Sequence, residues 1–243
     1  MENNIPRMDE LPKEAQAIFK TLKSTALFSE LSAKQLISLA SHCRLKQVKK
    51  GTTIYRKGDL ANHLYVIQSG YIIESVYYGS SVDVIVKVRS DGEYFGEIGL
   101  LSSGPYPNTV IALEDCCLID LAKSYFMEAV DENTSVCKVI ILELIDRLLN
   151  SAQNMVNSMY LDAPGLMAST IVNLTTNSRH KIMTIRITQS ALAFSSGMAR
   201  QTAAKILSEW RKEKIIATER GHLKVLDFNK LLDIILDSEI NSC

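Results

Sequence analysis

Short apolar stretches separated by glycines occupy the chain from about residue 44 to residue 121. Eight of the eleven glycines lie between residues 51 and 104, where they permit tight turns between the stretches. Short strands with turns at such intervals predict an antiparallel β-roll or barrel. A run at 32–43 before them has apolar residues at helical spacing, which predicts a helix packed on the roll. The predicted strands are 44–48, 52–55, 63–68, 71–77, 82–88, 109–112 and 116–121.

After about residue 131 the apolar pattern changes to a helical period. Spacings of four and three alternate along one seam, which predicts a helix from about 133 to 160 that pairs with a second copy in a coiled coil. The alternative is a long helix buried within one chain. The seam consists of Ile141, Ile145, Leu148, Ala152, Met155 and Met159.

Beyond residue 161 the pattern predicts a module of short helices and a hairpin. Asp162 before Pro164 is typical of a helix start, and Asp227 predicts a second start near the C-terminus. Two short helices meet at Gly197, whose freedom to adopt a left-handed conformation is typical of a helix-turn-helix. The predicted elements are a helix to about 177, a strand at 182–187, helices at 189–195 and 199–214, a strand–turn–strand at 215–226 and a helix at 228–236.

Composition places the chain among globular proteins, because 47% of its residues are hydrophobic and 22% are charged. No run approaches the roughly 20 apolar residues of a membrane span, and the polar N-terminus does not have the pattern of a signal peptide. We therefore expect a cytoplasmic protein with no membrane partner. The five cysteines form no spaced framework, so we expect reduced thiols, with Cys116 and Cys117 as apolar core residues rather than a redox pair.

The net charge of zero conceals an asymmetry along the chain. Residues 1–161 carry 16 basic and 19 acidic side chains, residues 162–226 carry 10 and 4, and residues 227–243 carry 1 and 4. The three segments therefore have net charges of −3, +6 and −3. A basic module around a helix-turn-helix predicts binding to double-stranded DNA.

The second helix of this motif carries polar residues on the face opposite its apolar positions. Arg200 and Lys205 have side chains that bind guanine in the major groove, and Gln201 has one that binds adenine. Polar residues near the helix starts are expected to contact DNA phosphates; these are Thr188, Gln189 and Thr202.

In this order, the roll, the long helix and the winged helix-turn-helix resemble the Crp/Fnr family of bacterial transcription regulators. The resemblance rests on GDLANHLYVIQSG at 58–70, YFGEIGLL at 94–101, LDAPG at 161–165 and the block at 187–216. It implies an α+β fold with a sensor roll similar to cyclic-nucleotide-binding jelly rolls at 1–130. A dimerisation helix at 131–161 and a winged helix-turn-helix domain with a C-terminal helix at 162–243 would follow.

The same resemblance implies a homodimer on a pseudo-palindromic DNA site, an effector at the roll, and RNA polymerase as a partner if the protein is an activator. The family commonly has Arg-Glu-Thr at the reading helix, with Arg four residues after the Glu. This chain has Arg-Gln-Thr at 200–202 and Lys205, so we expect a different half-site.

Relatives that bind cyclic nucleotides place a phosphate cassette at the positions of Gly96 and Glu97 and meet the base near Ser151. Where those relatives have an Arg-Ser pair, this chain has Pro107 and Asn108, and no Lys or Arg lies between residues 89 and 123. A buried phosphodiester would lack a guanidinium partner there. We expect a small molecule or another signal, not cyclic AMP, at this candidate effector pocket. A cyclic-nucleotide-responsive regulator with a divergent pocket is the alternative.

The sequence carries no catalytic motif: a nucleophile elbow, a Walker loop, His-Glu-x-x-His and Cys-x-x-Cys are all absent. No cysteine precedes Cys43, which argues against an N-terminal iron–sulfur ligand set. Neither His42 nor His63 has motif support as a haem ligand. We therefore expect a protein that is not an enzyme and holds no cofactor or metal. The other hypothesis, a cupin-like metal enzyme with an accessory domain, lacks the His-x-His spacing.

Overall fold

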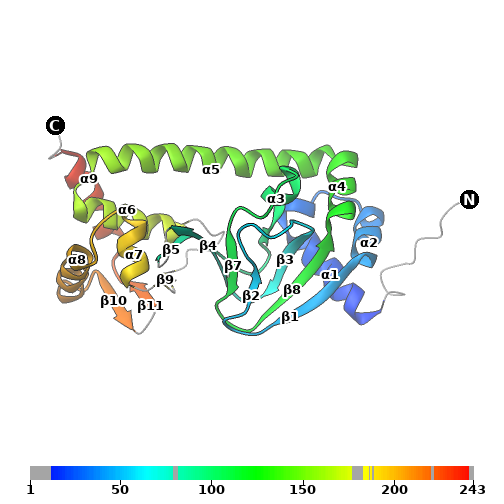
Figure 1. Cartoon of the computed structure of the whole chain (residues 1–243), viewed down its shortest axis with the longest axis horizontal. Coiled ribbons are helices and arrows are strands. Elements are labelled where there is room, and N and C mark those ends of the chain that lie inside the picture. Colours follow the sequence, from blue (N-terminus) through cyan, green and yellow to red (C-terminus); the bar gives the residue numbers. More distant parts are fainter. Residues whose placement is uncertain are drawn as a thin grey trace, which may run out of the picture. The chain divides into compact units, whose positions relative to one another are not determined.

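The computed structural model describes residues 12–78, 82–176, 183–185, 187, 189–219 and 222–240 (Figure 1). The chain divides into two compact units, one of residues 1–74 and 89–146 and one of residues 75–88 and 147–243. Among the described helices, none combines the length and apolar character that a membrane span requires.

The first unit begins with α1 (Lys13–Ser24), the 3-10 helix η2 (Ala26–Phe28) and α2 (Ala33–Ser41). Helix α2 starts after Ser32 because a capping box closes its first turn: the Gln35 N–H donates to Ser32 Oγ at 3.3 Å, and the Ser32 N–H donates to Gln35 Oε1 at 2.9 Å. The predicted helix at 32–43 is confirmed at its start but ends earlier, because Cys43 opens the first strand. Helix α1 was not predicted.

The roll consists of two four-stranded sheets, with orders β1-β8-β3-β6 and β2-β7-β4-β5. All seven predicted strands are present, and β6 is additional. Strand β8 pairs antiparallel with both β1 and β3, which places two apolar strands at the middle of the first sheet. The strands are β1 (Cys43–Val48), β2 (Thr53–Tyr55), β3 (His63–Ser69), β4 (Ile72–Tyr78), β5 (Val82–Arg89), β6 (Tyr94–Phe95), β7 (Thr109–Ala112) and β8 (Cys116–Ala122).

Three helices accompany the roll: α3 (Glu97–Leu101), α4 (Lys123–Glu132) and α5 (Thr134–Tyr160). Helix α5 confirms the long helix expected from 133 to 160. Its first turns belong to the roll, because Val136 and Ile140 are buried in the same apolar core as the strands. The rest of α5 belongs to the second unit.

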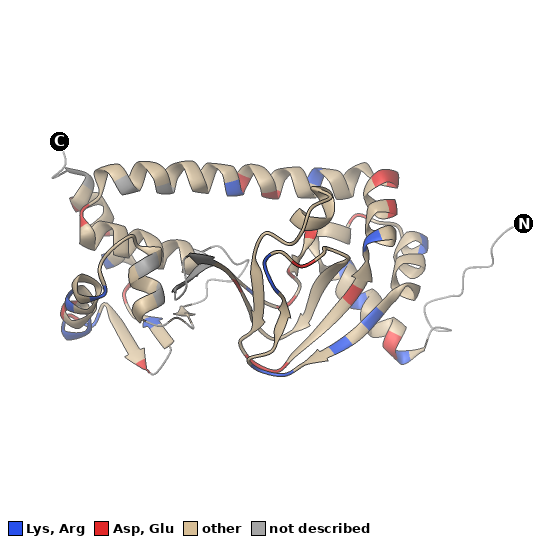
Figure 2. Cartoon of the chain, viewed as in Figure 1, with Lys and Arg blue, Asp and Glu red and all other residues tan. Residues whose placement is uncertain are grey.

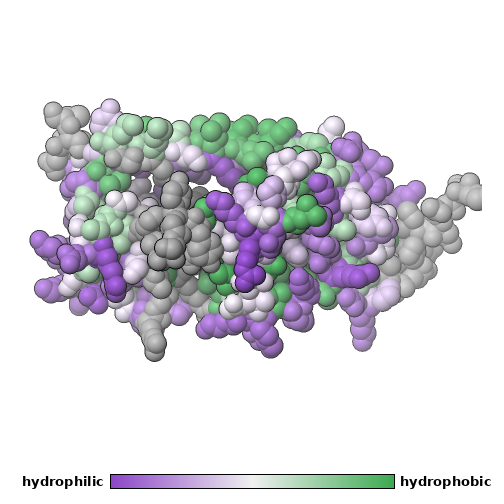
Figure 3. Space-filling view, viewed as in Figure 1, coloured by the Kyte–Doolittle hydropathy of each residue, from purple (hydrophilic) through white to green (hydrophobic). Residues whose placement is uncertain are grey.

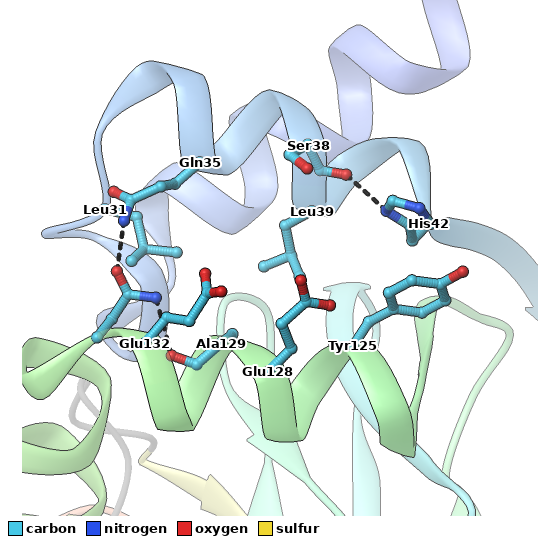
Figure 4. A pocket seen from close by; sticks show the side chains of 10 residues that line it. Leu31, Gln35, Ser38, Leu39, His42, Tyr125, Glu128, Ala129 and Glu132 are labelled. Carbon is cyan, nitrogen blue, oxygen red and sulfur yellow. Dashed lines mark hydrogen bonds between the residues drawn. The ribbon is translucent and has the colours of Figure 1, made fainter. Parts of the chain in front are cut away.

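The junction between α4 and α5 is tied to α2. Asn133 accepts a hydrogen bond from Gln35 Nε2 at 2.5 Å and donates to the Ala129 carbonyl at 2.9 Å. Figure 4 shows the shallow pocket of about 100 Å³ that lies between α2 and α4 at this point. His42 stacks there on Tyr125 with 3.9 Å between the ring centroids, so it has a packing role.

The second unit confirms the order of the predicted elements. Of the strand predicted at 182–187, residues 182 and 186 lie outside the described residues, and the strand itself spans Thr184–Ile185. Asp162 begins α6 by accepting from the Gly165 N–H at 2.9 Å, and Asp227 begins α9 by accepting from the Lys230 N–H at 3.0 Å. Ser238 of α9 donates to the same Asp162 carboxylate at 2.9 Å, which joins the two helices. The elements are α6 (Ala163–Thr176), β9 (Thr184–Ile185), α7 (Gln189–Ser195), α8 (Arg200–Lys212), β10 (Ile216–Glu219), β11 (His222–Val225) and α9 (Phe228–Ile240).

Candidate DNA interface and sensor site

Helices α7 and α8 form the predicted helix-turn-helix. Gly197 has a φ of +65°, and the Met198 N–H next to it donates to the Ala193 carbonyl at 3.0 Å. This left-handed residue turns the chain within the short link between the helices. The facing apolar residues are buried together; they are Leu192, Ala193, Ala203, Ile206, Leu207 and Trp210.

The opposite face of α8 is open to solvent. Arg200, Gln201, Thr202 and Lys205 are all exposed, so the three predicted base-reading residues share one free helix face. Figure 2 shows that Lys and Arg residues gather on α8. Ala199 precedes the helix without a capping side chain, and no side-chain hydrogen bond closes its first turn.

A groove of about 380 Å³ lies between the start of α8, the start of α7 and the β10–β11 hairpin. Gln189 and Arg200 line it together with Thr218 and His222 of the hairpin. The structure therefore brings one predicted phosphate contact and one predicted base-reading residue to the same groove, at the position of a wing. Thr188 lies outside the described residues.

In the roll, Gly96 precedes α3 with a φ of +97°. A Cβ at this position would lie 2.9 Å from the His63 carbonyl oxygen, so no other residue fits without displacing β3. Glu97, the first residue of α3, is only 4% exposed. Ser151 is exposed on the part of α5 that belongs to the second unit.

Glu97 belongs to an ion cluster, mostly buried, that the sequence pattern does not reveal. Arg89, at the end of β5, bonds Glu74 of β4 through Nε, and its Nη1 donates to Glu143 Oε1 of α5 at 3.2 Å. Its Nη2 lies 3.9 Å from Glu97 Oε1. Asn108 donates to the second oxygen of Glu74. We name five residues the Arg89 cluster, and they connect β4, β5, α3 and α5: Glu74, Arg89, Glu97, Asn108 and Glu143.

Electrostatics keep the guanidinium charged in this place. Desolvation lowers the pKa of Arg89, but the carboxylates of Glu74, Glu97 and Glu143 raise it by more, so that the pKa lies well above its usual value. Tyr94 donates its hydroxyl to Glu143, and burial together with that carboxylate raises the tyrosine pKa. Arg89 and Tyr94 are therefore both hydrogen-bond donors to Glu143 at neutral pH.

The sequence offers no signal for this cluster. In the strand VDVIVKVR, Arg89 alternates onto the same face as Asp83 and Lys87, so the pattern predicts a polar, outward position for its side chain. Its partners Glu74 and Glu143 are 15 and 54 residues away, so no local spacing identifies them.

The predicted dimer seam on α5 is exposed within the chain. Leu148 is 69% exposed and Met159 is 68% exposed, and Figure 3 shows apolar surface along this helix. The alternative of a helix buried within one chain therefore does not describe the seam. The other seam residues Ile141, Ile145, Ala152 and Met155 are exposed as well.

The cysteines near the roll are small buried side chains. Cys43, Cys116 and Cys117 are buried and unpaired by disulfides. Burial raises the pKa of each thiol, to about 12 for Cys43. Within the described part of the chain, no group of three or more His, Cys, Asp or Glu side chains is arranged to hold a metal ion.

Models of known protein families match parts of both units. A family model described as a cyclic nucleotide-binding domain matches residues 45–133, and one described as a Crp-like helix-turn-helix domain matches residues 167–234. The cAMP-activated global transcriptional regulator CRP of Pasteurella multocida is 25% identical over 182 residues, which cover 73% of this chain and 87% of the relative.

Two solved structures have the same fold. The c-di-GMP responsive global regulator CLP of Xanthomonas campestris has a TM-score of 0.63 at 19% identity, covering 80% of this chain and 99% of its own. The catabolite activator protein of Thermus thermophilus has a TM-score of 0.51 at 21% identity, covering 88% of this chain and 100% of its own. With a roll followed by a Crp-type helix-turn-helix, the chain belongs to the Crp/Fnr family of DNA-binding transcription regulators.

Proposed function

We propose that this protein is a cytoplasmic homodimer that binds a pseudo-palindromic DNA site through Arg200, Gln201 and Lys205 and is controlled by a signal other than cyclic AMP at its roll. The exposed polar face of α8 carries this proposal, because it presents guanine- and adenine-binding side chains on one helix beside a wing. Contacts from Gln189 and Thr202 to phosphates would fix the register on the duplex.

Dimerisation through the α5 seam supports a two-part DNA site. The seam is apolar, regular and exposed, and pairing it with a second copy would remove it from water. A two-fold symmetric dimer presents two reading helices, and such readers bind half-sites about one helical turn apart. RNA polymerase would be a further partner if the protein activates transcription.

The relatives do not share one effector, since one is named for activation by cAMP and another for its response to c-di-GMP. In this chain, Pro107 and Asn108 replace the cationic pair of nucleotide-binding relatives, and Glu97 already faces Arg89. A signal that changes the surroundings of Glu97 would reach α5 through Glu143. The link at 161–164 would then alter the position of the reading helices by a population shift.

Selection of bound sequences from random duplex DNA tests this proposal. The wild-type protein is expected to enrich a pseudo-palindrome whose half-site differs from the standard half-site of the family. Arg200→Ala is expected to lose most of this enrichment, and Arg44→Ala on exposed β1 of the sensor should retain it. Enrichment of no sequence by the wild-type protein would contradict the proposal, and recovery of the standard half-site would contradict the assignment of Gln201.

A further inference from the structure

A buried guanidinium occupies the interior of the first unit. Arg89 is 2% exposed, and of the Lys and Arg residues that the structure describes it is the only one in a buried position. Through its partners it connects β5 with β4, with the short helix α3 and with α5. A single side chain therefore joins the roll to the helix that leaves it.

The surroundings of Arg89 match a planar cation with several donors. Carboxylates of Glu74, Glu97 and Glu143 converge from three different elements, and each is within 4 Å of a guanidinium nitrogen. The second oxygen of Glu74 accepts a hydrogen bond from Asn108, so both oxygens of this carboxylate are hydrogen-bonded. The planar guanidinium of arginine has several N–H donors that point in different directions. It therefore suits these three carboxylates better than the compact ammonium of a lysine.

The same arrangement makes the binding of an anionic ligand unfavourable. A phosphate next to Glu97 would lie among three carboxylates in a region of low dielectric, and the guanidinium of Arg89 is already paired with them. Pro107 and Asn108 supply no further positive charge. Entry of a nucleotide would require Arg89 to leave at least one of its carboxylates. Glu74 and Glu97 are buried and Glu143 is partly buried, so any of them would lose this cationic partner away from bulk water.

We propose that Arg89 takes the place of an external ligand in the roll. Its guanidinium occupies the acidic site beside Glu97 and leaves no site for an anionic nucleotide. It also holds Glu143 and with it the first turns of α5. The proposal rests on the proposed function only in treating the roll as the sensor. Arg89 is a positioning residue in this scheme. The order of the first half of α5 depends on an internal cation rather than on an external molecule.

Chemical rescue of Arg89→Ala in the full chain tests the proposal. Truncation leaves three carboxylates around an empty space, and the melting temperature is expected to fall by about 10 °C. Guanidinium chloride, added far below denaturing concentrations, should raise the melting temperature of the variant and not that of the wild type. Sodium chloride and tetramethylammonium chloride at equal concentration should not raise it.

Phe95→Ala is the matched control. Phe95 is fully buried in the same roll, and its truncation leaves an apolar space without carboxylates. Its loss of stability is expected to be comparable, and guanidinium should not reverse it. Equal stabilisation of both variants by guanidinium, or of neither, would overturn the assignment of a specific guanidinium site.

A second variant covers the case in which Arg89→Ala does not fold. Glu143→Gln preserves the volume of the side chain and removes only the carboxylate that holds α5. Amide exchange at residues 140–146 is expected to accelerate several-fold, while exchange in β3 and β8 stays unchanged. Unchanged exchange in α5 would show that the Arg89 cluster does not hold this helix.

A calorimetric titration with cyclic AMP tests whether the site beside Glu97 excludes an anionic nucleotide. No binding to the wild-type protein is expected. Binding that Arg89→Ala abolishes would overturn the proposal, because Arg89 would then be a phosphate ligand. These measurements need no DNA, so a failure of the proposed function, seen as absent DNA selection, is distinguishable from a failure of this inference.

Discussion

Among single residues, Gly197 has the clearest conformational requirement in the DNA-binding unit. Its φ of +65° is a conformation that residues with a Cβ disfavour by about 1 kcal/mol or more, although a Cβ at this position would meet only open space. Strain of the backbone, and not a clash, is therefore the reason for glycine at this turn.

We expect Gly197→Ala to lower the free energy of unfolding of the second unit by about 1 kcal/mol, measured by urea denaturation. Gly197→Asn should cost less, because asparagine tolerates the left-handed conformation through local hydrogen bonds of its side chain. Equal losses in the two variants would indicate that the φ value does not determine the preference for glycine.

Gln201 is exposed on the polar face of α8 that we propose reads DNA, and its amide both donates and accepts. Gln201→Glu leaves only acceptors, so we expect the preferred base at the contacted position to change from adenine to cytosine, with a discrimination of about 2 kcal/mol. Competition binding with duplexes that differ at that position measures the change. An unaltered preference would mean that Gln201 does not touch a base.

Residues whose role is set by near neighbours could be predicted from sequence, and those set by distant partners could not. Asp162 and Asp227 cap helices through the N–H of the third residue after them, and the chain order contains that relation. Arg89 meets Glu143 across 54 residues, and no periodicity encodes the pairing. Glu97 was identified by resemblance, but its buried partner was not.

Among the elements, α5 has two faces with different environments. Val136 and Ile140 are buried in the roll core, whereas Leu148 and Met159 are exposed. The seam side chains on this helix are exposed among the residues that the structure describes, which is the pattern expected of a surface that pairs with a copy of itself.

Leu148→Asp places a charge in the middle of the seam, so we expect it to convert the dimer to monomers in sedimentation velocity experiments and to weaken DNA binding. Asn150→Asp adds the same charge to an exposed position of the same helix outside the seam and should leave the dimer intact. Helical content by circular dichroism should be unchanged in both. A dimeric Leu148→Asp protein would contradict the assigned seam.

Elements delimited by apolar runs and turn residues were predicted, whereas a two-residue strand and two amphipathic helices were missed. The bounds expected for α7 and β7 agree with the structure, because apolar runs and turn residues delimit both. Strand β6 has two residues and exists only through its pairing with β3. Helices α1 and α4 are amphipathic segments that were not recognised beside the stronger strand pattern.

For the whole molecule, the uneven charge distribution predicts how DNA binding responds to salt. The basic residues of the second unit include exposed Lys205 and Lys224, whereas the sensor segment is acidic in total. Counterions released from DNA by such a surface make affinity depend steeply on salt concentration.

We expect the affinity for the selected site to fall by about 1,000-fold or more between roughly 50 and 200 mM salt, measured by fluorescence anisotropy. Lys224→Gln on the wing should reduce the slope of log affinity against log salt by about 1 for each wing. Lys49→Gln in the sensor, where Lys49 pairs with Asp115 at 2.7 Å, should leave the slope unchanged. A slope that responds equally to both substitutions would not support a localised interface.

The exposed seam of α5 also has a consequence for gene dosage. If two chains must associate before they span both half-sites, the active fraction follows mass action and depends on how many copies a cell contains. At low copy number most chains would be single and inactive whatever the signal at the roll. The rate at which the cell synthesises this protein would then act as a second input to the regulation that it exerts.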